Sequence, residues 1–569
     1  MDDAAPGGAG RRRWSPLALV LLGVALLLAT RAFHRIPGLG NADIAGILYE
    51  ADIIRDGGVP YRDTMDMKSP GTWFLFAAIF RFVAREIWAV HAVFVAWCLL
   101  AAPAVWLAAR ALYAQRVIAA AAVLLYLAAV GLFDLNYSAW MTTPYAWSFA
   151  CLIVGLRAAR WSWAWHVLGG VFAAVAVVFK PHAFVLAPTF ILVWWWARRR
   201  GEAGAQWSAW PLWLLGALLG LAPLLLWYAY HGALPALIAG LFPFQIAREY
   251  GERSLGDTWW VWRAGKVPLQ LVAVFPLHAT LGVAAVIACG LARRAGRSCA
   301  PLAPSLIFLG WSVLGCGVGG LRFYIHYLPQ YLPALALLAV HPDGLAFLRG
   351  GLRRGLPWRA RLVPGVLAAT CAVLVAVLTI QIPLGKAARV DHKGNPQARL
   401  AGAYIAAHSE PEDRVQVWGW AAWSVYFWAD RRAPSPVFKV LGQVTDYNQN
   451  GLFSRSHTAD FRAGPAADAL LAAFASDPPA FFVRTFPFFP GVREDPLEQW
   501  PALKKIFAEQ YVMRKRFGKI RVYELRSRVS PDELEAAKRE ALTRPLLKRR
   551  GKTKAKPAKV LPKPPVKTP

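Results

Sequence analysis

The chain has 569 residues, of which 57% are hydrophobic and 27 are Trp, and it carries a formal net charge of +31. Long apolar runs recur through the first two thirds of the sequence, and the core of a water-soluble protein does not need such runs. Most of the Arg residues stand in short clusters between the runs, so the positive charge indicates membrane topology and not nucleic-acid binding.

The apolar runs predict membrane-spanning helices. A bilayer core of about 30 Å needs roughly 20 helical residues, and most of the runs approach this length. The first run follows three Arg residues, as in a signal peptide, but many spans and no clear cleavage site follow it, so we expect an uncleaved helix. The predicted fold class is a polytopic α-helical membrane protein with about eleven spans, near residues 15–32, 88–109, 117–133, 144–159, 161–179, 181–197, 209–230, 267–292, 301–319, 324–341 and 363–383.

Clusters of Arg predict the orientation of these spans. They fall at alternate ends of successive helices, as the positive-inside rule requires if they face the cytoplasm. We therefore expect a multi-pass protein of a bacterial-type inner (plasma) membrane, with a cytoplasmic N-terminus and residues 384–569 on the extracytoplasmic side. The clusters are Arg11 to Arg13, Arg110 with Arg116, Arg157 with Arg160, Arg198 to Arg200, Arg293 with Arg294 and Arg297, and Arg349 to Arg361.

The apolar segment 70–84 is the exception among the runs. It has only about 15 residues, or ~22 Å as a helix, and it carries Arg81. Counted as a span, it would reverse every later helix and place the later Arg clusters outside. We therefore predict an interfacial helix that lies along the outer leaflet.

The first outer loop, residues 33–87, concentrates acidic residues. Asp43 opens a stretch with apolar residues at helical spacing, and the stretch ends at the turn Asp56-Gly57-Gly58-Val59-Pro60. Lys68 stands directly before the predicted interfacial helix. This pair fits a lipid-phosphate site, in which the Lys neutralises phosphate charge while the Asp acts on an incoming hydroxyl. Two further acids are assigned to a solvated helix face, Asp52 and Asp56.

Residues 384–530 predict a small extracytoplasmic α/β domain. Short strand-like runs alternate there with helical patterns. The strand-like runs are Arg414–Trp420, Ala480–Phe486 and Ile520–Leu525, and the helical patterns are Gln397–Ala407 and Ala466–Ala475. The Lys/Pro-rich residues 544–569 predict a disordered basic tail.

Cysteine and histidine give no sign of a metal centre. Of the six Cys residues, five lie in apolar runs, and none follows position 371. No Cys-x-x-Cys pair or His-rich tract supports a metal site. No cofactor is therefore predicted, and a divalent metal stays open without support from the sequence.

Three stretches carry a family resemblance. The first is the loop run Asp43…Tyr49…Ala51…Gly57…Pro60-Tyr61-Arg62-Asp63…Lys68-Ser69-Pro70, and the second is Leu321 to Pro333. The third is a terminal helix followed by an outer α/β domain, with Val417-Trp418-Gly419-Trp420 in the expected strand. The chain thereby resembles bacterial GT-C glycosyltransferases (glycosyltransferase family 39-like), relatives of protein O-mannosyltransferases and of the aminoarabinose transferase of lipid A.

The resemblance implies roles for particular residues. Residues 1–383 would form the transmembrane glycosyltransferase-like domain, and the family's catalytic carboxylate falls on Asp43. The expected ligands of the donor phosphate are Lys68, Arg322 and His326, and secondary candidates are Asp63, Asp66, Asp134 and Tyr324. Two departures stand out: Ile44 replaces the Glu of the family's Asp-Glu pair, and Thr142-Thr143-Pro144 replaces an acid before a Pro.

The function implied is inverting transfer of a hexosyl or pentosyl group from a polyprenyl-phosphate-linked donor to an extracytoplasmic glycan, lipid or protein acceptor, with no nucleic-acid partner. Asp43 would deprotonate the acceptor hydroxyl, and Lys68 and Arg322 would stabilise the leaving polyprenyl phosphate. Two alternatives stay open. A lipid-linked glycan transporter would usually show paired halves, which the sequence lacks, and a non-catalytic cell-envelope assembly protein would need no base.

Overall fold

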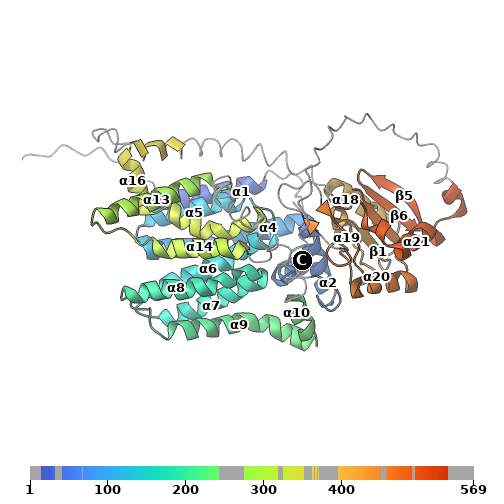
Figure 1. The fold of residues 1–569 in the computed structure, drawn as a ribbon, viewed down its shortest axis with the longest axis horizontal. Coiled ribbons are helices and arrows are strands. Elements are labelled where there is room, and N and C mark those ends of the chain that lie inside the picture. Colours follow the sequence, from blue (N-terminus) through green and yellow to red (C-terminus); the bar gives the residue numbers. More distant parts are fainter. Residues whose placement is uncertain are drawn as a thin grey trace, which may run out of the picture.

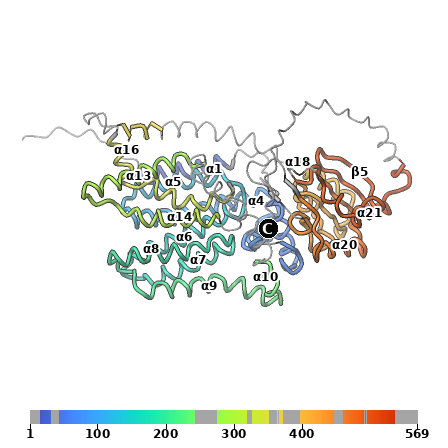
Figure 2. The backbone as a smooth tube through the Cα atoms, viewed as in Figure 1, coloured from blue at the N-terminus to red at the C-terminus, as the bar shows by residue number. Residues whose placement is uncertain are grey.

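The computed structural model describes residues 15–32, 42–66, 68–241, 274–317, 325–351, 362–363, 365–367, 369–370, 395–445, 448–449, 457–489, 492 and 494–535. A bundle of helices forms one end of the molecule and an α/β domain forms the other (Figure 1). Helix α2 (Ala42–Arg55) lies between the two in Figure 1, and a blue stretch of the trace occupies the same place in Figure 2.

The bundle is built from apolar helices. Within the described residues, α4, α6, α7, α9 and α13 are long and apolar enough to cross a membrane. The pair His326–Ala339 and Pro342–Gly350, bent by 59°, is either one broken span, which would make six, or a re-entrant loop. The predicted total of about eleven stays a prediction, because the runs near 267–292 and 363–383 lie partly outside the described residues. The helices are α1 (Pro16–Ala32), α4 (Ile87–Tyr113), α5 (Arg116–Val130), α6 (Tyr137–Arg157), α7 (Ser162–Phe179), η1 (Pro181–Val185), α8 (Leu186–Arg199), α9 (Ala209–Tyr230), α10 (Leu234–Leu241), α13 (Pro276–Arg294), α14 (Ala303–Gly317), η2 (Ile325–Tyr331), α15 (Leu332–Ala339) and α16 (Pro342–Gly351).

Arg-bearing turns meet at one end of the bundle. Arg157 follows α6 and forms an ion pair of 3.7 Å with Glu202, which follows α8. The same guanidinium also donates to the carbonyl oxygen of Ala111 near the end of α4. Three of the predicted Arg-rich turns therefore share one end, as the positive-inside rule requires. Which compartment this end faces stays a prediction.

Helix α3 (Gly71–Phe82) corresponds to the short apolar segment. Its 12 residues extend about 18 Å, which is too short to cross a bilayer core. It buries Trp73 and Phe76 against its neighbours, while Phe82 remains 83% exposed. The length agrees with the prediction that this segment is not a span, and its position at the outer leaflet stays a prediction.

The α/β domain contains a four-stranded sheet with the order β1 (Val415–Trp418), β4 (Phe481–Thr485), β6 (Ile520–Leu525) and β5 (Tyr511–Phe517). Strands β1 and β4 are parallel, and the other two pairs are antiparallel. Because side chains alternate along a strand, Val415 and Val417 share a core with α18 (Asn395–Ala407) and α19 (Ser424–Ala429). Trp418 and Phe482 face the opposite side and pack with α20 (Pro465–Ser476) and α21 (Pro501–Gln510).

These elements confirm the predicted fold class of a helical membrane protein with a C-terminal α/β domain. All three predicted strands and both predicted helices are present. Three elements, α19, α21 and β5, were not predicted from the sequence. Strand β5 continues into β6 through a turn at Gly518, where φ is +59° and glycine is favoured. A short antiparallel pair, β2 (Asn448–Gln449) and β3 (His457–Thr458), completes the described strands. The predicted tail at 544–569 lies outside the described residues.

The α/β domain docks on α2 through ion pairs. Asp52 is buried and accepts two hydrogen bonds from Arg85, at 2.8 and 2.7 Å. Arg432 of the α/β domain forms an ion pair with Asp56, and its backbone neighbour Ala433 donates to the Tyr49 hydroxyl at 3.0 Å. The assignment of Asp52 to a solvated face is therefore wrong. The apolar spacing of α2 did not reveal a partner that comes from the start of α4.

Candidate functional site

The candidate site begins at the first turn of α2, where Asp43 and Lys68 meet. The Asp43 Oδ1 atom lies 3.3 Å from Lys68 Nζ, and both side chains are half-buried. A carboxylate is favoured there because the N-terminus of a helix carries partial positive charge. Lys68 is held in place because its carbonyl oxygen accepts a hydrogen bond from the Tyr61 hydroxyl. Tyr61 adopts a φ of 65°, a value that a residue other than glycine rarely takes, so the turn itself directs this contact.

A Lys from the α/β domain reaches the same face of α2. Asp43, Gly46 and Glu50 lie on one face, because they are spaced by three and four residues along the helix. Lys439 crosses this face at Gly46, where a Cβ atom would lie 2.6 Å from the Lys439 Cε. The Lys439 ammonium then forms a buried ion pair with Asp66. Because Gly46 has no side chain, the Lys439 side chain of the α/β domain can pass over α2 and place its ammonium near Asp43.

The electrostatic surroundings keep Asp43 ionised. Burial raises the pKa of its carboxyl, but the neighbouring ammonium groups, Lys68 first and then Lys439, outweigh burial. The pKa of Asp43 therefore lies below its usual value of 3.8. Asp43 is a carboxylate at neutral pH.

Glu50 is held in the opposite state. It is fully buried, and its Oε2 accepts a hydrogen bond of 2.7 Å from the Thr64 hydroxyl. Burial, and then the negative charge of Asp66, raise the pKa of Glu50 above its usual value of 4.5. Within the described residues, its second oxygen has no hydrogen-bond partner. The site thus contains one carboxylate that is kept charged and one carboxyl that favours its neutral form.

The raised pKa of Glu50 predicts a pH dependence of stability. The folded state holds this proton more tightly than the unfolded state, so the stabilisation is complete below pH 4.5 and is lost as pH rises through the folded pKa. Glu50→Gln keeps the neutral form at every pH, so we expect a higher melting temperature than wild type at pH 8.5 and a similar one at pH 5. Thermal unfolding of both proteins in detergent measures this. Equal pH dependence in the two proteins would contradict the assignment.

A second cation, Lys180, lies at the same end of the bundle, between α7 and η1. Its side chain is 8% exposed; the ammonium donates to the Ser138 hydroxyl and lies 3.6 Å from the centre of the Tyr327 ring. Lys180 interacts electrostatically with both Lys68 and Asp43. No carboxylate in the described part of the chain forms an ion pair with it. Burial lowers the pKa of Lys180 to about 7, so an anionic ligand beside it would favour the charged ammonium form.

The structure gathers some of the predicted site residues and separates others. His326 lies edge-on to Tyr327, its ring centre 4.6 Å away, and it contributes to the field at Asp43. Asp66 forms a buried ion pair with Lys439. Asp63 pairs with Arg62 at 2.7 Å in a surface turn. Asp134 accepts a hydrogen bond of 3.3 Å from the Asn136 backbone and interacts electrostatically with Lys180. Two predicted residues lie outside the described residues, Arg322 and Tyr324.

Ile44 and the Thr142-Thr143 pair, which depart from the expected pattern of acids, pack or hydrogen-bond inside the protein. Ile44 is fully buried, so the residue next to Asp43 packs in the core and does not add a second acid. Thr143 is also buried and donates to the carbonyl oxygen of Trp97 at 2.9 Å, while Thr142 donates to that of Ala139 at 2.7 Å. Both hydroxyls are thus satisfied within the bundle.

Three residues near Asp43 and Lys68 were not predicted as site residues from the sequence: Glu50, Lys180 and Lys439. Glu50 could have been found from its helical spacing with Asp43. Lys180 is a single Lys between two apolar runs, and a charged group at that depth is a functional candidate by default. No local pattern marks Lys439, because it lies 373 residues from its partner Asp66.

Comparisons with known proteins agree with this architecture. No protein-family model and no curated protein sequence matches the chain. Among solved structures, ArnT from Cupriavidus metallidurans bound to undecaprenyl phosphate is similar, with a TM-score of 0.56 and 14% identity over 90% of this chain and 99% of that one. The oligosaccharyltransferase of Archaeoglobus fulgidus in its apo form is similar with a TM-score of 0.51 and 12% identity, over 84% of this chain and 70% of that one.

Identities this low show the fold alone, and both matches extend over the membrane bundle and the outer domain together. The fold resemblance proposed from the loop motif is thereby confirmed. The chain shares its overall fold with ArnT from Cupriavidus metallidurans and with the oligosaccharyltransferase of Archaeoglobus fulgidus.

Proposed function

We propose that this protein transfers one hexosyl or pentosyl group, with inversion, from a polyprenyl-phosphate-linked donor to a glycan, lipid or protein acceptor outside the cytoplasm. One observation carries the proposal. An ionised carboxylate, Asp43, lies beside Lys68 and close to the buried ammonium of Lys180. Transfer from a lipid phosphate needs this combination, because a base must act on the acceptor while cations stabilise the phosphate that leaves.

The donor phosphate is the natural partner of the two lysines. Lys180 has no anionic partner among the described residues, and Lys68 shares its charge with Asp43. A phosphate between them would accept charge-assisted hydrogen bonds from both ammonium groups, and His326 lies near enough to contribute. Cleavage of the bond between the anomeric carbon and the phosphate oxygen leaves a polyprenyl phosphate, whose developing charge these cations stabilise.

Asp43 acts on the acceptor. Its pKa is low while Lys68 is its close partner, and a carboxylate with a low pKa is a weak base. Donor binding draws the Lys68 ammonium toward the phosphate and so weakens its hold on Asp43. The carboxylate then takes the proton of the acceptor hydroxyl as the oxygen attacks the anomeric carbon from the side opposite the phosphate, which inverts that centre.

The test is mass spectrometry of envelope glycans and lipids from cells with and without this protein. We expect a glycan, lipid or protein that is heavier by one sugar residue only when the protein is present. Identical profiles would refute the proposal. An unmodified acceptor together with a lipid-linked glycan retained on the cytoplasmic face would favour the transporter alternative instead.

A further inference from the structure

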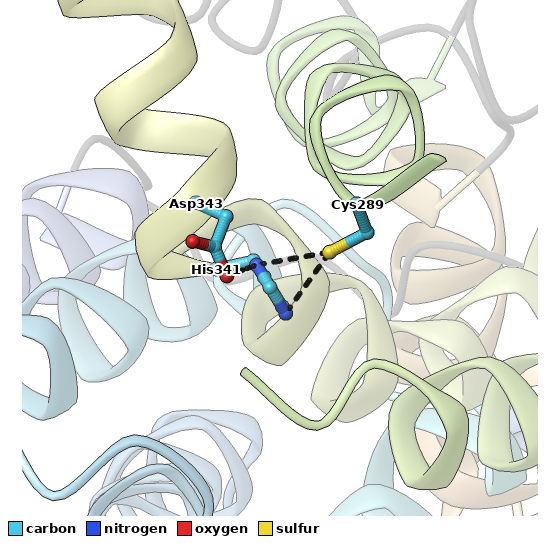
Figure 3. A group of neighbouring side chains, drawn as sticks. All are labelled: Cys289, His341 and Asp343. Atoms are coloured by element: carbon cyan, nitrogen blue, oxygen red, sulfur yellow. Dashed lines mark hydrogen bonds and ion pairs between the residues drawn. The ribbon is translucent and has the colours of Figure 1, made fainter. Parts of the chain in front are cut away.

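A cluster of metal-ligating side chains lies away from the transfer site. Cys289 of α13, His341 at the bend between α15 and α16, and Asp343 in the first turn of α16 point toward one another (Figure 3). Their ligand atoms all lie within 4.8 Å of one another. The sulfur of Cys289 is 3.8 Å from His341 Nε2 and 4.0 Å from Nδ1, and His341 Nδ1 is 3.8 Å from Asp343 Oδ2.

A further thiol, Cys299, lies near Cys289 but is not among the three residues whose ligand atoms all lie within 4.8 Å of one another. Cys299, in the connection between α13 and α14, packs against the same small apolar cluster as Cys289, and the two thiols lie near each other. The next residue, Ala300, donates its backbone N–H to Asp343 Oδ2 at 2.8 Å. The connection is thereby fixed beside the cluster.

The contacts between the side chains of this cluster are long. The Cys289 sulfur is nearly equidistant from both ring nitrogens, at separations longer than a strong hydrogen bond. His341 is fully buried, and the Tyr113 ring packs edge-on against it with the ring centres 5.3 Å apart. Two thiols, an imidazole and a carboxylate are a donor set for tetrahedral Zn²⁺; here Cys289 and His341 are buried, while Cys299 and Asp343 are partly exposed.

The geometry is close to what zinc needs. Zinc–ligand bonds of about 2.0–2.3 Å place ligand atoms roughly 3.4–3.8 Å apart in a tetrahedral site. The separations among Cys289, His341 and Asp343 exceed this by up to ~1 Å, which small rotations of the Cys289 and Asp343 side chains remove. The His341 ring must also turn, so that one nitrogen lone pair faces the metal.

We infer that Cys289, Cys299, His341 and Asp343 form a structural Zn²⁺ site. The thiols lose their protons on binding, and the nearby Arg293 offsets part of the resulting negative charge. The metal would join α13, the connection to α14 and the 59° bend between α15 and α16. This end of the bundle carries Arg293 and Arg294 and is predicted to be cytoplasmic, where thiols stay reduced.

Metal content of the full-length protein purified in detergent tests the inference, with a readout that does not depend on sugar transfer. After loading with Zn²⁺ and gel filtration, we expect about one zinc per chain in the wild type. Cys289→Ser and His341→Ala should each lose at least about nine tenths of it, whereas Cys151→Ser, a buried cysteine in α6, should keep it. Equal zinc in all four proteins, or none in the wild type, would overturn the site.

Cobalt substitution of the wild type keeps the inference testable if the variants fail to fold. Tetrahedral Co²⁺ bound by thiolates gives intense visible bands and a thiolate charge-transfer band in the near ultraviolet, which we expect here. Octahedral Co²⁺ spectra, or a Cys289–Cys299 disulfide in the protein as isolated, would overturn it.

Discussion

Asp43→Asn is expected to abolish sugar transfer while the protein still folds and inserts. Asn has the size and polarity of Asp but cannot accept the acceptor's proton, and general-base contributions are typically ~10²- to 10⁴-fold. In cells that lack the native protein, the complementing variant should therefore restore less than about one hundredth of the missing modification, as quantified by mass spectrometry. Ile44 is buried and carries no carboxylate, so the adjacent residue cannot take over.

A matched control comes from the same loop. Glu86 is exposed and its side chain caps no helix backbone, so Glu86→Gln removes one negative charge near the membrane surface without touching the cluster. We expect this variant to restore the modification fully. Transfer by Asp43→Asn at the wild-type rate would show that Asp43 is not the base. Equal loss in both variants would show that loop charge matters and that no base has been identified.

Lys180→Met is expected to weaken binding of undecaprenyl phosphate without lowering the stability of the ligand-free protein. Met keeps the length of the side chain but removes a buried ammonium, which no described carboxylate neutralises, so the ligand-free protein should be at least as stable as wild type. The affinity for undecaprenyl phosphate should fall by roughly 10- to 100-fold, because a charge-assisted hydrogen bond is lost. Thermal unfolding of the detergent-solubilised protein, titrated with undecaprenyl phosphate, measures both quantities.

Lys505→Met provides the comparison for that substitution. Lys505 is exposed on α21 of the α/β domain, so its replacement changes net charge equally but leaves the cluster intact. Its titration with undecaprenyl phosphate should follow that of the wild type. A Lys180→Met protein that binds the lipid with unchanged affinity would exclude Lys180 from the phosphate site.

The sequence predicts the fold well because the relevant patterns are local. Apolar runs locate the helices, Arg clusters indicate which turns share an end, and alternation of strands and helices identifies the outer domain. Asp43 and Lys68 were also within reach, since both belong to one loop of the chain and meet at 3.3 Å in the structure. Two residues of one loop can be related without long-range information.

The rest of the site depends on contacts that no local pattern encodes. Lys439 reaches Gly46 and Asp66 only because the α/β domain docks on α2. Asp52 was assigned to solvent because the pattern of α2 gives no hint of Arg85 and Arg432, which surround it in the folded chain. The zinc ligands come from α13, the connection that follows it and the α15–α16 bend, so no short motif contains them. Tertiary packing determines each of these groups.

A structure of the protein with undecaprenyl phosphate, determined by cryo-electron microscopy, tests the central claim most directly. We predict phosphate density between Lys68 and Lys180, within hydrogen-bond distance of both ammonium groups, and a Lys68–Asp43 separation longer than 3.3 Å. Phosphate bound elsewhere, with the Lys68–Asp43 ion pair unchanged and Lys180 still bonded only to Ser138, would contradict the assignment of this cluster as the transfer site.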